Sequence, residues 1–521
     1  MNEALPRRRR GGGRAGNVRR GGSAIDQLDW HIPQISDSPT EPLTEEGVAA
    51  IHDAAMRILE EIGIDFLHDG ARKRLKEAGA DVTDGEERVR MDRAMVMDLV
   101  AKAPEQFTLT PRNPERQVTI GGNHQVYVNV SSPPSCSDLD RGRRSGDRES
   151  FRDLIKLSQY FNCIHLVGGY PVEPVDVHPS IRHLDCIHDK LLLTDKVIHT
   201  YSLGVERVED TMEMIRIGGG LTHEEFEATP RMYTNINSTS PLKHDWPMLD
   251  GAMRLAERGQ MVTVTPFTLS GAMAPVTLAG AIAQQTAEAL AAIALLQHIK
   301  PGCPVVMGSF TSNVDMKSGA PAFGTPEYMR ATQMSGQMAR HYALPLRSSN
   351  ACAANAPDAQ AAWESAFSLW ACVSSRTNIV YHAAGWLEGG LCASYEKFVM
   401  DCETLQQMSR YMRPVSVTED DLAVDAIAEV DAMPEAQRHF LGAQHTMDRY
   451  ETAFYKPFLS NWDSYQAWEN AGSQRTPQRA NRIWKQILAE FEAPAMDPAI
   501  AEELSEFVER RKAEGGAPTD F

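Results

Sequence analysis

The sequence has no C-x-x-C pair and no long apolar run, and both absences narrow the class of protein. Its eight cysteines are scattered from Cys136 to Cys402. A disulfide framework is therefore not expected in so large a core, and the thiols should be reduced. No stretch approaches the roughly 18 to 20 consecutive apolar residues of a membrane span, and the N-terminus has no apolar core of the secretory kind. We expect a soluble, cytoplasmic protein with no membrane partner.

Sequence signatures of dinucleotide binding, metal binding and cysteine catalysis are also missing. No G-x-G-x-x-G motif follows any strand-like run, which disfavours a dinucleotide-binding doubly wound sheet. His178, His183 and His188 follow one another at a spacing that brings no two onto one helix face, so no bound metal is expected. Cys352 has no adjacent base, which favours a small buried residue over a nucleophile.

Net charge is unevenly spread along the chain. The whole chain carries −18, whereas residues 1–22 hold seven arginines against one glutamate. An acidic body does not suit a nucleic-acid-binding surface, so nucleic acid is not an expected partner of the fold. The Gly/Arg-rich tail has almost no large apolar side chains to pack, so we expect it to be disordered. It would act as a solubilising or weakly docking arm, with RNA or an acidic partner as the alternative.

A regular alternation of strand and helix patterns begins near residue 125. Eight short apolar or β-branched runs recur with centres roughly 30 to 42 residues apart, the spacing of strand–helix units in a parallel α/β fold. Amphipathic helix patterns fill the gaps between them. Eight units over about 260 residues predict an α/β protein with a (β/α)8 TIM barrel. The runs are centred near Val128, His165, His199, Thr234, Val264, Val306, Leu346 and Val380.

Helices are expected before and after the barrel in the sequence. Thr44 is a plausible N-cap for a helix that ends at Gly63. Its apolar stripe comprises Val48, Ile51, Ala55, Ile58 and Ile62. Near the C-terminus, residues 478–494 place Ala480, Ile483, Trp484, Ile487, Leu488 and Phe491 on one face. We predict a disordered tail (1–30), an N-terminal helical extension (31–120), the barrel (121–400) and a C-terminal helical region (401–521). A homo-oligomer is compatible with this organisation.

The residues that follow the predicted strands include almost no carboxylates. In a barrel these positions carry the site, and here they offer aromatic rings, hydroxyls, amides, one arginine and one histidine. Ring faces suit a quaternary ammonium, which cannot donate hydrogen bonds, and one arginine suits a carboxylate on the same molecule. The aromatic residues could equally be barrel packing, and His382 a core histidine. The candidate substrate-binding residues are Tyr170, Tyr201, Asn237, Phe267, Phe310 and Trp386, and the candidate catalytic residues are Arg347, Asn350 and His382.

Four segments give the chain a family resemblance. They are "LSGAMAPVTLAGAIAQQTAEALAAIAL", "GSFTSNVDMKSGAPAFGTPE", "LPLRSSNACAANAPDAQAAWES" and "HFLGAQHTM". The most specific elements are G-x-x-x-P-x-x-x-x-G (Gly271, Pro275, Gly280) and D-x-Q (Asp358, Gln360). On these residues the chain resembles the trimethylamine methyltransferase superfamily over nearly its whole length outside the tail.

The resemblance implies a (β/α)8 protein that moves a methyl group from a methylated amine to the cob(I)alamin of a separate corrinoid protein. Archaeal trimethylamine enzymes of this family carry pyrrolysine, and no such residue occurs here. Relatives without it are linked to quaternary amines such as glycine betaine. By this resemblance Arg347, helped by Asn350 or His382, would bind a betaine carboxylate. Tyr170, Tyr201, Phe267 and Trp386 would face the cation.

Two other functions are kept open by the sequence. One is a barrel that binds a quaternary amine without turnover. The other is an RNA-associated protein that acts through its arginine tail. Calorimetric binding without methyl transfer would select the first, and loss of RNA binding on deletion of residues 1–22 would select the second.

Overall fold

Eight short parallel strands occupy the positions of the eight predicted runs. The computed structural model describes residues 25–519, so residues 1–24 of the predicted tail lie outside the described part. Six strands form one parallel sheet in the order β11-β13-β15-β18-β19-β6, and β9 pairs in parallel with β10. The strands are β6 (Val126–Tyr127), β9 (Leu166–Val167), β10 (Val197–Ile198), β11 (Tyr233–Ile236), β13 (Met261–Val264), β15 (Val305–Gly308), β18 (Leu346–Ser349) and β19 (Ile379–Tyr381).

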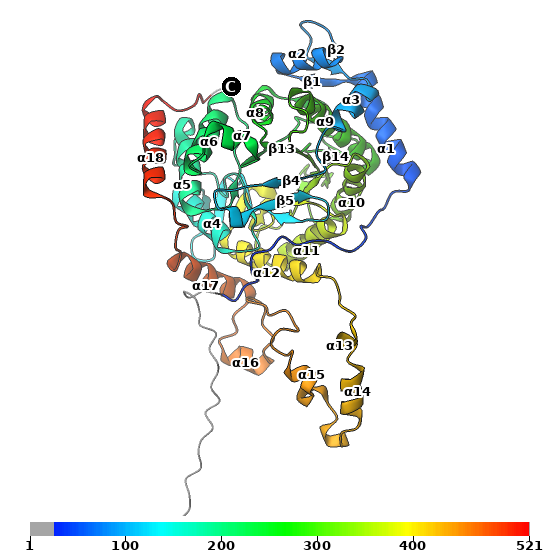
Figure 1. Cartoon of the computed structure of the whole chain (residues 1–521), viewed down its shortest axis with the longest axis vertical. Helices are drawn as coiled ribbons and strands as arrows, with labels where there is room; N and C mark the ends of the chain where they lie inside the picture. The colour runs from blue at the N-terminus through cyan, green and yellow to red at the C-terminus, as the bar shows by residue number, and fades with distance from the viewer. Residues whose placement is uncertain (1–24, 520–521) are drawn as a thin grey trace, which may run out of the picture.

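Helices follow each strand and surround the curled sheet (Figure 1). Short strands often stand between a sheet strand and its helix, at the carboxyl end of the sheet. The helices are α4 (Arg148–Tyr160), α5 (Pro179–Leu193), α6 (Val205–Gly218), α7 (His223–Ala228), α8 (Trp246–Glu257), α9 (Leu278–Ile299), α10 (Pro326–His341), α11 (Ala359–Ser374) and α12 (Tyr395–Tyr411). The additional strands are β7 (Ser135–Asp138), β8 (Gly142–Ser145), β12 (Lys243–His244), β14 (Leu269–Ser270), β16 (Ser312–Val314), β17 (Pro321–Ala322), β20 (Trp386–Leu387) and β21 (Cys392–Ser394).

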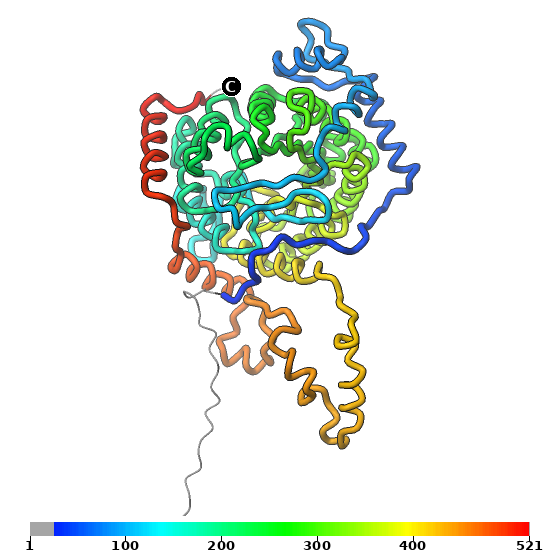
Figure 2. Tube along the Cα trace, viewed as in Figure 1, coloured from blue at the N-terminus to red at the C-terminus, as the bar shows by residue number. Residues whose placement is uncertain are grey.

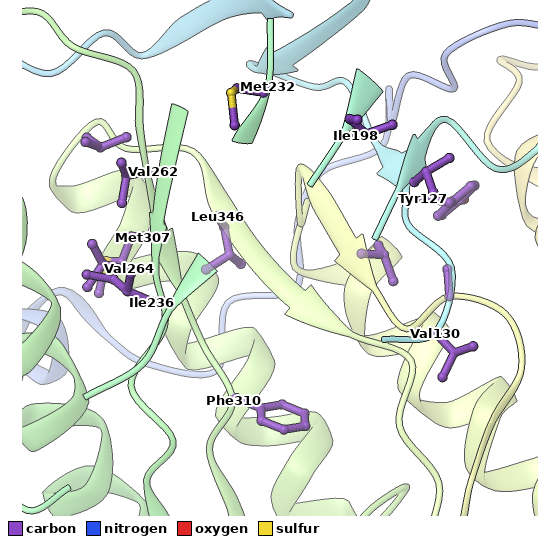
Figure 3. Packing of buried hydrophobic residues seen from close by; sticks show 14 of the residues in the cluster. Tyr127, Val130, Ile198, Met232, Ile236, Val262, Val264, Met307, Phe310 and Leu346 are labelled. Carbon is purple, nitrogen blue, oxygen red and sulfur yellow. The ribbon is translucent and has the colours of Figure 1, made fainter. Parts of the chain in front are cut away.

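Side chains alternate between two apolar layers along each sheet strand. In β15, Val306 belongs to a cluster inside the curled sheet, whereas Val305 and Met307 belong to the larger core beneath the helices. Figure 3 shows Val262, Val264 and Met307 together in that second layer. A strand such as β15, buried on both faces, reads as a nearly continuous apolar run, which is why the sequence predicted it.

The segment before the parallel sheet contains strands as well as helices. It holds α1 (Glu45–Arg57), α2 (Asp69–Ala78), α3 (Arg93–Val100), β1 (Ile64–Phe66), β2 (Asp81–Val82), β3 (Arg88–Arg90), β4 (Gln106–Leu109) and β5 (Val118–Gly121). The β4–β5 hairpin crosses the sheet in Figure 1. Its Leu109, Val118 and Ile120 pack in the inner cluster. The hairpin therefore plugs the amino end of the strands, and a site is expected at the opposite end.

The predicted N-terminal helix is correct in its limits but not in its whole apolar stripe. Thr44 caps α1, and the chain leaves the helix at Gly63, whose φ is 85°. Residues Ile58–Ile62 form a π-helical turn, which rotates the face that follows. Leu59, four residues after the buried Ala55, is buried, whereas Ile62 at the end of this turn is 50% exposed.

The C-terminal region combines two packed helices with a projecting segment. α17 (Thr476–Ala489) packs on α12, and α18 (Pro498–Ala513) packs on α5 and α6. The predicted face of α17 is confirmed for Ala480, Ile483, Trp484 and Ile487, which are buried. Between α12 and α17 the chain forms α13 (Glu419–Leu422), α14 (Val424–Asp431), α15 (Gln444–Met447) and α16 (Tyr465–Asn470). These four short helices stand away from the body in Figures 1 and 2.

Within residues 25–519 one helix, α9, is long and apolar enough to cross a membrane. Of its most apolar window, 83% is buried inside the protein, as expected of a core helix. The eight cysteines are all free, as predicted, and all eight are buried.

Candidate functional site

A cavity of about 540 Å³ lies at the carboxyl ends of the parallel strands. Seven of the nine candidate residues line it. No aspartate or glutamate stands among the lining residues of the described chain, and Arg347 is their one arginine or lysine. The seven candidates are Tyr201, Asn237, Phe267, Phe310, Arg347, His382 and Trp386. The cavity therefore combines apolar and aromatic walls with uncharged polar groups and a single cation, and it has no carboxylate among these residues.

Arg347 is a buried cation without a counter-ion. It is the second residue of β18 and only 3% exposed. One guanidinium nitrogen donates to the Ser309 carbonyl at 3.4 Å, Nε has no hydrogen-bond partner, and no carboxylate of residues 25–519 forms an ion pair with it. The guanidinium carbon lies 4.4 Å from the Tyr381 ring centroid and 5.2 Å from that of Phe310. Burial lowers the pKa of Arg347, yet an arginine stays charged in proteins, so the site can accept an anion.

His382 follows β19 in a backbone conformation unusual for histidine. Its φ is 55°, a left-handed value that positions the side chain at some cost in backbone energy. Burial, and then Arg347, lowers the pKa of His382 well below its ordinary value, so the ring is neutral at pH 7. Its Nδ1 has no hydrogen-bond partner in the described chain. A neutral ring with one unpaired nitrogen can complete the polar part of the cavity.

Aromatic rings cover another part of the cavity. The Phe267 and Phe310 rings stack with centroids 5.1 Å apart, and the Trp386 ring lies edge-on to Phe310 at 6.2 Å. The indole of Trp386 donates to the Cys352 carbonyl at 3.1 Å, and His382 packs on it at 4.1 Å. These contacts fix the rings before any ligand enters. Their π faces can attract a cation that has no protons to donate.

Tyr201 and Asn237 are held by hydrogen bonds to the surrounding loops. The Tyr201 hydroxyl accepts from the Tyr170 amide at 2.9 Å and contacts the Ser132 hydroxyl at 2.7 Å. The Asn237 amide donates to the Thr265 carbonyl at 2.8 Å. Both side chains therefore stabilise the wall of the cavity as well as lining it.

Two candidate residues lie outside this cavity. Tyr170 lines a neighbouring cavity of about 200 Å³, and its ring centroid is 4.7 Å from that of Tyr201. Asn350 is 1% exposed and donates to the Ala383 carbonyl at 3.0 Å. Tyr170 thus supports a lining ring from behind, and Asn350 fixes the loop that carries His382.

His199 and Tyr381 line the cavity but were not among the predicted residues. The Nε2 atom of His199 accepts from the Asn235 amide at 3.2 Å, which assigns the ring proton to Nδ1, and Nδ1 has no partner in the described chain. Burial, and then Lys190, lowers the pKa of His199 well below its ordinary value. The Tyr381 hydroxyl is likewise unpaired. The available signal was strand alternation, because residues two apart on a strand point to the same face. Val197 and Ile379 point inside the curled sheet, so His199 and Tyr381, two residues later, are expected on that face too.

Cys352 is suited to packing, as the sequence favoured. Its thiol donates to the Trp386 carbonyl at 3.0 Å, and burial raises the pKa of Cys352 to about 12. The thiol therefore stays protonated at neutral pH and is a poor nucleophile. No group of three or more His, Cys, Asp or Glu side chains in residues 25–519 is placed to hold a metal ion.

Comparisons with known proteins place this architecture in a family. The family described as trimethylamine methyltransferase (MTTB) matches residues 9–516. A glycine betaine methyltransferase of Desulfitobacterium hafniense (strain Y51) is 37% identical, over 82% of this chain and 89% of the relative. A proline betaine:corrinoid methyltransferase of Eubacterium limosum is 28% identical, over 64% and 70%. A trimethylamine methyltransferase of Desulfitobacterium hafniense (strain DSM 10664 / DCB-2) is 26% identical, over 82% and 85%.

A solved structure agrees in fold. The monomethylamine methyltransferase of Methanosarcina barkeri aligns with a TM-score of 0.50 and 10% sequence identity, over 89% of each chain. At this identity the likeness concerns the fold alone.

Proposed function

Because the chain belongs to the trimethylamine methyltransferase family, we propose that it transfers a methyl group from a carboxylate-bearing quaternary amine, such as glycine betaine, to a corrinoid protein. The substrate assignment rests on one observation: Arg347 is a buried cation without a counter-ion in the described chain. It lies against a cavity with aromatic walls and no acidic side chain among its described lining residues. Such a cavity complements one negative and one positive group on the same molecule.

The carboxylate would bind at the polar end of the cavity. Arg347 offers its unpaired Nε, and His199 its unpaired Nδ1–H. His382 and the Tyr381 hydroxyl contribute two more unpaired polar atoms. A buried polar atom without a partner costs free energy, so a ligand that satisfies several of them is bound more tightly. Asn350 would act indirectly, by holding the Ala383 carbonyl and with it the loop of His382.

The trimethylammonium group would face the aromatic end. Phe267, Phe310, Trp386 and Tyr201 line the cavity, with Tyr170 behind Tyr201. The positive charge on nitrogen disappears as the methyl group leaves. A complete aromatic cage would stabilise the bound substrate more than the transition state and so slow the reaction. A cavity with only a few rings, and with Asn237 on a polar part of its wall, avoids this loss of rate.

The chemistry agrees with the lack of acids in the cavity. A quaternary ammonium releases a neutral tertiary amine, so the leaving group needs no proton and the residues need only orient the N–CH₃ bond. Cob(I)alamin, carried by the partner protein, would supply the nucleophile. Leu391 lines the cavity and is 52% exposed, so the cavity reaches the surface where an external nucleophile can approach. This access fits a corrinoid held by another protein.

We also propose that the curled sheet closes into a barrel. Single parallel bridges join Val128 to Leu166 and His199 to Tyr233. They link the β9–β10 pair to both edges of the six-stranded sheet, and we infer from them a closed (β/α)8 barrel.

The domain limits 1–30, 31–120, 121–400 and 401–521 are kept as a proposal, although Ile25 is buried and the limit at 400 falls inside α12. A cytoplasmic location is proposed with them.

A panel of methylated amines tests the function. The purified chain is mixed with cob(I)alamin, and corrinoid methylation is followed by absorbance. Glycine betaine or proline betaine should support methylation, whereas dimethylglycine, which is not quaternary, should not. Calorimetric binding of these betaines without any methylation would overturn the transferase and select a non-catalytic binding barrel. Methylation from trimethylamine alone would overturn the substrate assignment.

A further inference from the structure

The outward face of α11 is apolar along its length. Ala359 and Ala362 are exposed, and Trp363, Phe367 and Trp370 are 53%, 49% and 40% exposed. A helix that packs on a sheet normally presents polar residues to solvent. Three aromatic residues at successive turns form a contiguous patch, unlike the single apolar residues that are common on surfaces. We name Trp363, Phe367 and Trp370 the aromatic stripe.

A second uncovered apolar surface begins beside the stripe. Tyr411 ends α12, its ring centroid is 5.1 Å from that of Trp370, and residues 413–454 follow as the arm. Of the arm, only Val430 and Ala443 are buried. Figure 2 shows the arm extending away from the body as a long hairpin. Its exposed large apolar residues are Val415, Val417, Leu422, Val424, Ile427, Phe440, Leu441, Met447, Tyr450 and Phe454.

The arm gains little stability from apolar burial within itself, although Arg449, just after α15, forms an ion pair with Asp420 of α13. Its short helices bury almost nothing against one another, so their ordering is not offset by apolar burial. Together the stripe, Tyr411 and the arm expose on the order of 1,500 Å² of apolar side-chain surface per chain. Two chains would then bury about 3,000 Å², within the range of obligate dimers.

We propose that this chain forms a dimer in which the arm of each copy packs on the aromatic stripe of the other. Tyr411, the last residue of α12 before the arm, contacts Trp370 of the stripe. A two-fold axis near this contact would place the arm of each copy beside the stripe of the other. Such an interface is self-complementary and closed, which leaves no free apolar surface to propagate a fibre. The inference does not rest on the proposed function.

A second copy fits this surface better than a corrinoid protein does. A carrier that delivers a corrinoid must dissociate in each cycle, and transient partners have small and more polar interfaces. Between cycles it would leave the whole apolar arm in water. A permanent partner made with the chain itself avoids that exposure.

Sedimentation of the full chain tests the proposal. The wild type should sediment as a dimer of the 57.7 kDa chain, or as a higher even multiple. Trp363→Ser with Phe367→Ser changes the stripe, and Leu441→Ser with Phe454→Ser changes the arm. Each pair should weaken association at least about 30-fold, the effect of losing one interface hot spot. Leu139→Ser, at a residue 50% exposed on the β7–β8 turn, is the matched control and should stay dimeric.

Mixing the two variants separates exchange from indirect damage. A mixed pair retains one intact contact, between the arm of the stripe variant and the stripe of the arm variant. Dimers should therefore reappear in the mixture, though weaker than wild type. A monomeric wild type at tens of micromolar would overturn the proposal, whether or not its arm then binds a corrinoid protein. Stripe and arm variants that both stay fully dimeric would overturn it equally.

Discussion

Replacement of Arg347 by alanine should lower kcat/KM for glycine betaine about 100- to 1,000-fold. This range corresponds to about 3 to 4 kcal/mol, the usual loss when one partner of a buried charged pair is removed. Arg347 is 3% exposed and has no counter-ion in the described chain. Without it the substrate carboxylate would lose its water and gain no positive charge in return. Calorimetry of glycine betaine, together with methyl-transfer kinetics, measures the loss.

Two controls make this prediction specific. Arg347→Lys keeps the charge but not the planar fork, so activity should recover only in part. Choline has the trimethylammonium group but no carboxylate, and Arg347 should repel it. Arg347→Ala should therefore bind choline as well as the wild type does, or better. An equal loss for choline and glycine betaine would show that Arg347 only supports the fold.

Replacement of Lys397 by methionine should destabilise the protein by about 3 to 5 kcal/mol. Lys397 and Asp401 form an ion pair on α12 whose side chains are 1% and 3% exposed. Asp401 also accepts from the Gly385 amide at 2.9 Å, next to the cavity residue Trp386. Removal of the lysine leaves a buried carboxylate with no cation, which is far more costly than loss of the pair as a whole. The shift is measured by urea unfolding against wild type.

A double variant and an exposed pair serve as controls for Lys397. Lys397→Met with Asp401→Leu removes both charges, so it should recover part of the lost stability. Arg57→Met breaks the pair with Glu61, whose side chains are 58% and 59% exposed, and should cost under about 1 kcal/mol. If Lys397→Met were no worse than Arg57→Met, the buried pair would not contribute as described.

Buried strands could be predicted from the sequence, and polar strands could not. β13 (Met261–Val264) and β15 (Val305–Gly308) are buried at every position, so each reads as a run of apolar and β-branched residues. β3 (Arg88–Arg90) has one buried residue between two arginines, which leaves almost no pattern to detect. The extension was therefore predicted as helical only. The exposed arm was missed because periodicity cannot tell an apolar face that packs within the chain from one that awaits another molecule.

The site was predicted to the extent that strand ends define it. Arg347 and Phe310 were found because parallel strands gather the residues that follow them at the carboxyl edge of the sheet. Tyr170 and Asn350 belong to the same strand ends but turn away from the cavity, which depends on loop geometry that no residue pattern encodes. His199 was overlooked inside its apolar run, although alternation with Val197 already turned it inward.

The most direct test of the central claim is a crystal structure of the protein with glycine betaine. The carboxylate should lie within hydrogen-bond distance of Arg347, and the trimethylammonium group should contact the rings of Phe310 and Trp386 with one methyl group toward the mouth of the cavity. Glycine betaine bound elsewhere, or with its carboxylate at the mouth and its cation beside Arg347, would contradict the account.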